Sequence, residues 1–262
     1  MGLLGSYRRY KKAYKNYMRV MLDLISNKQH IKIIARNGKS SFWNQQKTHM
    51  YSLYIDNNLE GGSLDFFTFE NSVIPGCMNF KYKSGQLFMC GMENNHNFLS
   101  TFGADEYLPL KVAGQYVIDI GSNVGDSPIY FTLNEAENVI AIPAPSFFNN
   151  MSQNIKVNDL EKRVNVINGT YAGKENDIVL KDLLNKYKIK SAVLKIDDIN
   201  SIAKLLNEDN DTLRVFSRMQ ILYSGNEAAV KEKLESAGFK VSILPRKLKD
   251  ANTDSKFIFA EQ

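Results

Sequence analysis

Two short stretches of this sequence carry residue types that could hold a small ligand. The first runs from Asp119 to Gly125, where an apolar run ends at an acid and glycine or asparagine follows at alternate positions. Glycine lets a ligand approach the backbone because it lacks a Cβ, and the free N–H groups of a following helix can bind polar ligand atoms. The pattern predicts a nucleotide-type site at the carboxyl end of a strand, and it lacks the G-x-G-x-x-G of dinucleotide-binding proteins.

The second stretch is a pair of carboxylates, Asp197 and Asp198, which follows the apolar run 193–196. Paired carboxylates can orient a hydroxyl group, accept its proton or bind a divalent cation. Alternatively, one of them caps a helix that begins near Ile199, since aspartate is a favourable N-cap residue. The sequence leaves both interpretations open. Lys195 lies inside the same apolar run, where pairing with a neighbouring acid would account for it.

The elements that must position these residues have the spacing of βαβ units from Tyr116 onward. The pattern predicts an α/β fold with a doubly wound, mostly parallel sheet, whose last two strands form a closing antiparallel hairpin. In such sheets ligands bind at the carboxyl ends of the strands near the switch point, so both stretches should face one crevice. The predicted strands lie near 116–120, 138–142, 163–167, 192–196, 218–223, 239–244 and 256–260.

The residues before this region predict a smaller, different arrangement. We divide the chain into residues 1–110, a helix with a small antiparallel β region, and residues 111–262, a Rossmann-like domain. Apart from a helix over residues 7–26, the predicted elements are a tight hairpin and short strands. They lie at Ile31–Arg36 and Lys39–Trp43 for the hairpin, and at Phe66–Phe69, Phe80–Lys83 and Gln86–Cys90 for the strands.

The predicted N-terminal helix is amphipathic and basic. Six lysines and arginines precede the first acid, Asp23. A helical projection places these bases on one face and a tyrosine- and methionine-rich stripe, which includes Tyr10, Tyr14, Met18 and Ile25, on the other. One interpretation is a helix that covers a core with this stripe. The other is a weak contact of residues 7–25 with an anionic membrane surface or with a polyanionic substrate.

Residues 119–126 resemble the first motif of S-adenosylmethionine-dependent methyltransferases, and their form D-x-G-x-N-x-G-D is similar to that of the FkbM family of O-methyltransferases. The resemblance covers roughly residues 112–245. It implies a class I methyltransferase fold, S-adenosylmethionine as the cofactor, and methyl transfer to a hydroxyl group of a sugar or another small metabolite. It implies Asp197 and Asp198 as catalytic residues, and a set of cofactor-binding residues comprising Asp119, Gly121, Ser122, Asn123, Gly125, Asp126, Ala144, Asn168 and Gly169.

Three positions depart from the family pattern. The second strand of the family usually ends in an acid that binds the ribose hydroxyls, whereas this chain reads Ile142-Pro143-Ala144-Pro145. The fourth strand lacks the usual D-x-E-G-x-E, and a further acid is replaced by Leu222. These losses motivate an alternative interpretation, a catalytically degenerate methyltransferase fold that binds a ligand or a partner. A nucleotide-binding oxidoreductase is a third interpretation, which the absent G-x-G-x-x-G disfavours.

The composition excludes several other classes. Two cysteines are too few for a disulfide framework, so a reducing, cytoplasmic location is expected, with a single bridge left open. No apolar run approaches the ~20 residues of a membrane span. The three histidines have no spacing that specifies a metal, and no nucleic-acid recognition motif accompanies the net charge of +5. We therefore expect no metal and no nucleic acid, and the sequence does not predict an oligomeric state.

Overall fold

The computed structural model describes residues 3–56, 77–82, 85–91, 96–172, 176–223, 225, 227–247 and 256–262. The chain forms two units. One comprises residues 1–87, 93–105 and 247–251, and the other comprises residues 88–92, 106–246 and 252–262.

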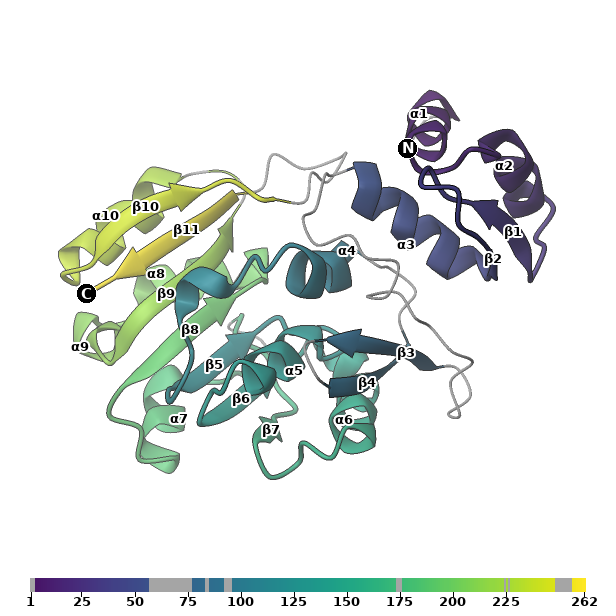
Figure 1. The fold of residues 1–262 in the computed structure, drawn as a ribbon. Helices are drawn as coiled ribbons and strands as arrows, with labels where there is room; N and C mark the ends of the chain where they lie inside the picture. Colours follow the sequence, from purple (N-terminus) through teal and green to yellow (C-terminus); the bar gives the residue numbers. More distant parts are fainter. Residues whose placement is uncertain are drawn as a thin grey trace. The chain divides into compact units, whose positions relative to one another are not determined.

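The second unit is built on a seven-stranded sheet with the order β10-β11-β9-β8-β5-β6-β7 (Figure 1). Strands β5, β6, β7, β8 and β9 pair with one another in parallel, whereas β11 is antiparallel to both β9 and β10. The predicted fold class, a doubly wound, mostly parallel sheet with a closing antiparallel hairpin, is confirmed. The strands are β5 (Tyr116–Ile120), β6 (Asn138–Ile142), β7 (Val164–Val166), β8 (Ala192–Ile196), β9 (Phe216–Tyr223), β10 (Lys240–Leu244) and β11 (Lys256–Glu261).

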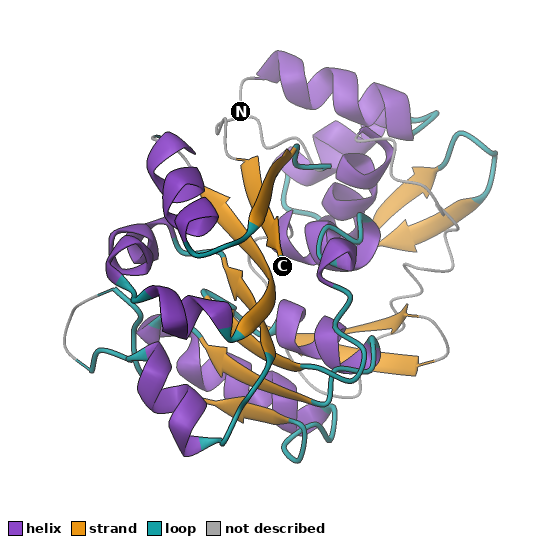
Figure 2. Ribbon diagram, turned by 90° about the vertical axis from the view of Figure 1, so that its left-hand side faces the viewer, coloured by secondary structure: helices purple, strands orange, loops and turns teal. Residues whose placement is uncertain are grey.

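Helices flank this sheet (Figure 2). Gly238 follows the last of them with a φ of +97°, as expected of the glycine that ends a helix. The helices are α5 (Asp126–Leu133), α6 (Phe148–Val157), α7 (Leu180–Lys186), α8 (Ile202–Asn207), α9 (Asn210–Arg214) and α10 (Glu227–Ser236), with 3-10 turns at Leu108–Leu110, Pro145–Phe147 and Ile199–Ser201.

The switch point of the sheet lies between β5 and β8. The chain continues from β5 through β6 to β7 on one side, and from β8 to β9 on the other. Both central strands are apolar and almost wholly buried, as parallel strands covered on two faces must be. Asp119 and Lys195 are charged but equally buried. The register makes them direct neighbours across the two strands. The carboxyl ends of β5, β6 and β8 therefore meet at one edge.

The first unit contains helices and two small sheets. Strands β1 and β2 form the predicted antiparallel hairpin, and β3 pairs with β4, whose last residues belong to the second unit. The predicted strand Phe66–Phe69 lies outside the described residues. The elements are α1 (Leu3–Ala13), α2 (Tyr17–Ile25), β1 (Ile31–Ile34), β2 (Ser40–Trp43), α3 (Gln45–Asp56), β3 (Cys77–Tyr82), β4 (Gly85–Cys90), α4 (His96–Phe98) and a π-helical turn at Leu99–Gly103.

The single helix predicted over residues 7–26 is wrong, because the chain breaks between α1 and α2. The side chain of Asn16 accepts a hydrogen bond from the N–H of Ile34 and donates one to the carbonyl of Lys32, both at 2.8 Å. These bonds tie the break to the edge of β1. The break also divides the predicted apolar stripe: Tyr10 and Tyr14 are buried, whereas Met18 and Ile25 on α2 are exposed.

Both cysteines, Cys77 and Cys90, are disulfide-bonded. The sequence left this bridge open. Disulfides are typical of oxidising compartments, so this bridge does not support the predicted reducing, cytoplasmic location. That location stays an expectation from the sequence. Of the helices that the structure describes, none is long and apolar enough to span a membrane.

Candidate functional site

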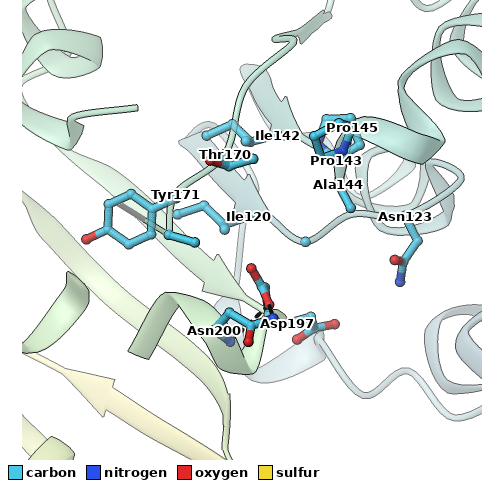
Figure 3. Close-up of a pocket in the computed structure, with 13 residues that line it drawn as sticks. Ile120, Asn123, Ile142, Pro143, Ala144, Pro145, Thr170, Tyr171, Asp197 and Asn200 are labelled. Carbon is cyan, nitrogen blue, oxygen red and sulfur yellow. Dashed lines mark hydrogen bonds between the residues drawn. The ribbon is translucent and has the colours of Figure 1, made fainter. Parts of the chain in front are cut away.

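A cavity of about 400 Å³ lies at the carboxyl edge of the sheet in the second unit. Its walls come from the ends of β5, β6 and β8 and from the loop that follows β7. Figure 3 shows Asp197 and Asn200 on one side of it and the run from Pro143 to Pro145 on the other. The lining residues are Ile120, Gly121, Asn123, Ile142, Pro143, Ala144, Pro145, Thr170, Tyr171, Ala172, Asp197, Asp198 and Asn200.

The loop after β5 contributes Gly121 and Asn123 to the cavity wall. Both have positive φ, +77° and +42°, and Gly125 at +101° follows them. The prediction that Gly121 makes room for a ligand stays a prediction, but the packing of the strand ends gives a second reason for glycine here. A Cβ on Gly121 would lie 2.9 Å from the backbone C of Asp197 and the backbone N of Asp198. Glycine is therefore needed here so that the ends of β5 and β8 can pack together.

Asp119 lies beneath this loop and does not line the cavity. Its side chain is fully buried, 2.8 Å from Nζ of Lys195, and it accepts a hydrogen bond of 2.7 Å from Ser127. Lys195 is equally buried and contacts Oδ2 of Asp197 at 3.1 Å. Burial disfavours the ammonium, but the two carboxylates raise the pKa of Lys195 above its ordinary value. Lys195 is thus a buried cation held between two acids on neighbouring strands.

Asp197 is the carboxylate whose second oxygen remains available. Its Oδ2 accepts a hydrogen bond from the hydroxyl of Tyr107 as well as contacting Lys195. Burial, followed by the negative charge of Asp197, raises the pKa of Tyr107 well above its ordinary value, so this residue remains a phenol that donates. Oδ1 of Asp197 is buried at the cavity wall and has no hydrogen-bond partner among the residues that the structure describes.

Asp198 also lines the cavity, but its oxygens are engaged. Oδ1 accepts hydrogen bonds from the backbone and the side chain of Asn200, both at 3.0 Å, and Oδ2 accepts one from Ser201 at 3.0 Å. These are the bonds of an N-cap residue. The capping role, which the sequence left open, is the one observed for Asp198.

The loops after β6 and β7 complete the wall. Ala144, which the sequence places among the cofactor-binding residues, lines the cavity and has an exposed side chain. Asn168 and Gly169 do not line it, and a Cβ on Gly169 would lie 2.7 Å from Ile178, so Gly169 serves packing. The next residues, Thr170 to Ala172, form the wall instead. Oγ1 of Thr170 is buried and has no hydrogen-bond partner in the described part of the chain.

The predicted residues therefore fall into two groups. Gly121, Asn123, Ala144, Asp197 and Asp198 line the cavity, whereas the others lie outside its wall. This second group comprises Asp119, Ser122, Gly125, Asp126, Asn168 and Gly169.

Sequence reasoning missed several residues of the site. Tyr107 lies ninety positions before Asp197, and no pattern in the sequence joins the two. Tyr171 directly follows the segment Asn168-Gly169-Thr170, which the sequence places after the third strand, and could have been found by extending that segment by one residue. Lys195 was identified from the sequence, and its predicted pairing with a neighbouring acid is confirmed by its contacts with Asp119 and Asp197. The described residues hold no group of three or more histidine, cysteine, aspartate or glutamate side chains able to bind a metal ion.

Comparisons with known proteins give matches to solved structures alone. No family model matches the sequence, and no curated protein matches it. A Streptococcus pneumoniae protein assigned as a tRNA (m1A22) methyltransferase, crystallised with S-adenosyl-L-methionine, is 17% identical over 64% of this chain and 71% of its own, with a TM-score of 0.46. Trm5b from Pyrococcus abyssi is 16% identical over 73% and 56% of the two chains, with a TM-score of 0.47. TYW2 from M. jannaschii, in complex with AdoMet, is 16% identical over 71% and 84%, with a TM-score of 0.46.

Proposed function

We propose that this chain is an S-adenosylmethionine-dependent methyltransferase that binds its cofactor in the cavity at the ends of β5, β6 and β8. The observation that carries the proposal is the buried Oδ1 of Asp197, which lies at the cavity wall without a hydrogen-bond partner among the described residues. A carboxylate oxygen in such a place suits a donor group of a cationic ligand. S-adenosylmethionine carries both a sulfonium and an ammonium group.

The charge of the residues that line the cavity favours a cationic ligand over an anionic one. The described residues that line the cavity include two aspartates and no lysine or arginine. A dinucleotide brings phosphates, which proteins bind with basic side chains and helix N-termini. The lining therefore favours S-adenosylmethionine over a nicotinamide dinucleotide, in agreement with the absent G-x-G-x-x-G.

The residues present suit the proposed cofactor in the size and the chemistry of the cavity as well as in charge. The volume of about 400 Å³ lies within the range of about 300–1,000 Å³ typical of small-molecule sites. Ile120, Ile142 and Pro143 offer apolar contacts suited to a nucleoside, and Thr170 offers a hydroxyl that lacks a partner among the described residues. When bound, the cofactor would supply the electrophilic methyl group.

The proposed acceptor is a hydroxyl group of a sugar or of another small metabolite. Of the two carboxylates, we assign to Asp197 the role of binding a donor at Oδ1, either on the cofactor or on the acceptor. Its other oxygen is held by Tyr107 and Lys195, which fixes the direction of the free one. Asp198 is assigned to capping, because its two oxygens already accept three bonds.

A second candidate function is ligand binding without methyl transfer. The specific observation in its favour is the end of β6, where Pro143, Ala144 and Pro145 place no polar side chain at the cavity. A weakly held cofactor would follow from this wall.

Titration calorimetry with S-adenosylmethionine, its demethylated product and NAD tests these proposals. We expect both sulfur compounds to bind and NAD not to bind. Binding of NAD alone, or of none of the three, would overturn the proposed cofactor. Transfer of a labelled methyl group to a panel of sugars and small alcohols then separates the two candidates, because binding without transfer to any acceptor supports the non-catalytic function.

A further inference from the structure

Helix α2 in the first unit presents an apolar stripe to solvent. Met18, Leu22 and Ile25 are 65%, 59% and 72% exposed. Their spacing of four and three residues places them on one face of the helix. The opposite face is inward, since Val20 and Asp23 are buried. Three large aliphatic side chains in a row are unusual on a surface, because exposed apolar residues normally occur singly.

The stretch of chain that contains this stripe is strongly basic. Residues 1–56 contain eleven lysines and arginines but two acids, a net charge of +9, whereas the remaining chain is net negative, since the whole carries +5. Among the described residues of this stretch, the exposed bases are Arg8, Lys11, Lys12, Lys15, Arg19, Lys28, Lys32, Arg36 and Lys39.

One of the two acids is neutralised within the fold. Asp23 is buried, with its carboxylate 2.8 Å from Lys28 and 3.1 Å from Arg19. The hydrogen bond from Lys28, followed by the charge of Arg19, lowers the pKa of Asp23 against the opposing effect of burial. The other acid, Asp56, lies 3.9 Å from Lys12. Both acids of residues 1–56 are therefore paired with bases, and most of the bases in this stretch are exposed.

We propose that α2 is a docking surface for an anionic membrane. Met18, Leu22 and Ile25 would enter the boundary between headgroups and acyl chains, while the flanking bases contact the anionic headgroups. Interfacial helices combine these two features, an apolar face and lysine- or arginine-rich flanks. A nucleic acid would use the bases but would gain nothing from the aliphatic stripe. A second copy of the chain would bring one net charge of +9 against another.

Vesicle sedimentation with the full-length chain tests this proposal. We expect sedimentation with vesicles that contain phosphatidylglycerol and none with phosphatidylcholine alone. Raising the salt from about 0.1 M to about 1 M shortens the Debye length from about 10 Å to about 3 Å and should weaken binding. The triple substitution Met18→Ser, Leu22→Ser and Ile25→Ser should lower the partition coefficient at least about tenfold.

The matched control is Leu108→Ser, because Leu108 is a 60% exposed aliphatic residue of the other unit. It should sediment like the parent. The triple variant replaces exposed side chains only, so its melting temperature should be unchanged. Three results would overturn the proposal: full sedimentation of the triple variant, no binding of the parent to anionic vesicles, or a parent that is dimeric in gel filtration where the triple variant is monomeric. A shift of single-stranded RNA by the parent that the triple variant loses would assign α2 to nucleic acid instead.

Discussion

The two sides of the cavity differ in the polar side chains that they offer to a ligand. On the β8 side, Asp197 is backed by Lys195 and Tyr107, and Lys195 in turn by Asp119. On the β6 side, the run from Ile142 to Pro145 provides no polar side chain, and its two prolines lack an N–H as well. The β8 side can bind a ligand through the carboxylate of Asp197, whereas the β6 side offers mainly apolar contacts.

This difference shows which partners a buried carboxylate needs when one of its oxygens points into a cavity. Removing a carboxylate from water costs several kcal/mol unless it is paired and hydrogen-bonded. Asp197 meets that requirement through Lys195, two positions earlier on β8, and through Tyr107, in the segment before β5. An acid at the end of β6 would need less support, because Ala144 is exposed.

The largest effect should come from removing the cation behind Asp197. Lys195→Met leaves Asp119 and Asp197 buried without their shared ammonium. Breaking a buried pair by removal of one partner typically costs about 3–5 kcal/mol, so we expect a loss of this size in urea denaturation. In the double variant with Asp119→Asn the loss should be smaller than the sum of the two single losses. A loss below about 1 kcal/mol for Lys195→Met would show that the network contributes little.

The next effect concerns the packing of the two strand ends. Gly121→Ala places a Cβ 2.9 Å from the backbone of Asp197 and Asp198, in a residue with a φ of +77°. The left-handed conformation costs about 1–2 kcal/mol and overpacking typically about 1–3 kcal/mol, so we expect about 2–5 kcal/mol of destabilisation. Gly114→Ala is the matched control, because its φ is +66° and a Cβ there would meet nothing within 4 Å. Equal losses for both variants would mean that the contact across the strand ends costs nothing.

The fold was largely predictable, because its signals are local. The buried strands read as apolar runs, and Asp119 and Asp197 mark the ends of two of them. The ligand-facing residues were less predictable. Whether Gly121 faces a ligand or a neighbouring backbone depends on which strand lies beside β5. The partnership of Tyr107 with Asp197 depends on a contact between distant segments. The break at Asn16 was not predictable from the helical pattern, because it is stabilised by hydrogen bonds to β1, outside the helix itself.

The third effect separates the two neighbouring carboxylates. Asp197→Asn removes the charge at the cavity wall with little change in volume, and hydrogen bonds to charged groups contribute about 1.5–3 kcal/mol. We therefore expect S-adenosylmethionine to bind more weakly by about 10–100-fold in calorimetry. The control is Asp198→Asn, which keeps an oxygen for the cap and should leave both binding and stability nearly unchanged. Weaker binding for Asp198→Asn than for Asp197→Asn would reverse the two assignments.

The smallest effect should come from making the β6 side polar. Ala144→Glu introduces an acid at the strand end where the FkbM family, which the sequence resembles, usually has one. The side chain of Ala144 is exposed, so the new carboxylate needs no buried partner and the melting temperature should not change. If it reaches the ribose hydroxyls, S-adenosylmethionine should bind about tenfold more tightly, equivalent to about 1.4 kcal/mol. Ala144→Gln has nearly the same shape without the charge and should gain less, because bonds to charged groups are the stronger ones. An unchanged affinity for both variants would mean that the ribose does not lie against β6, and the two sides of the cavity would then differ for a reason other than cofactor binding.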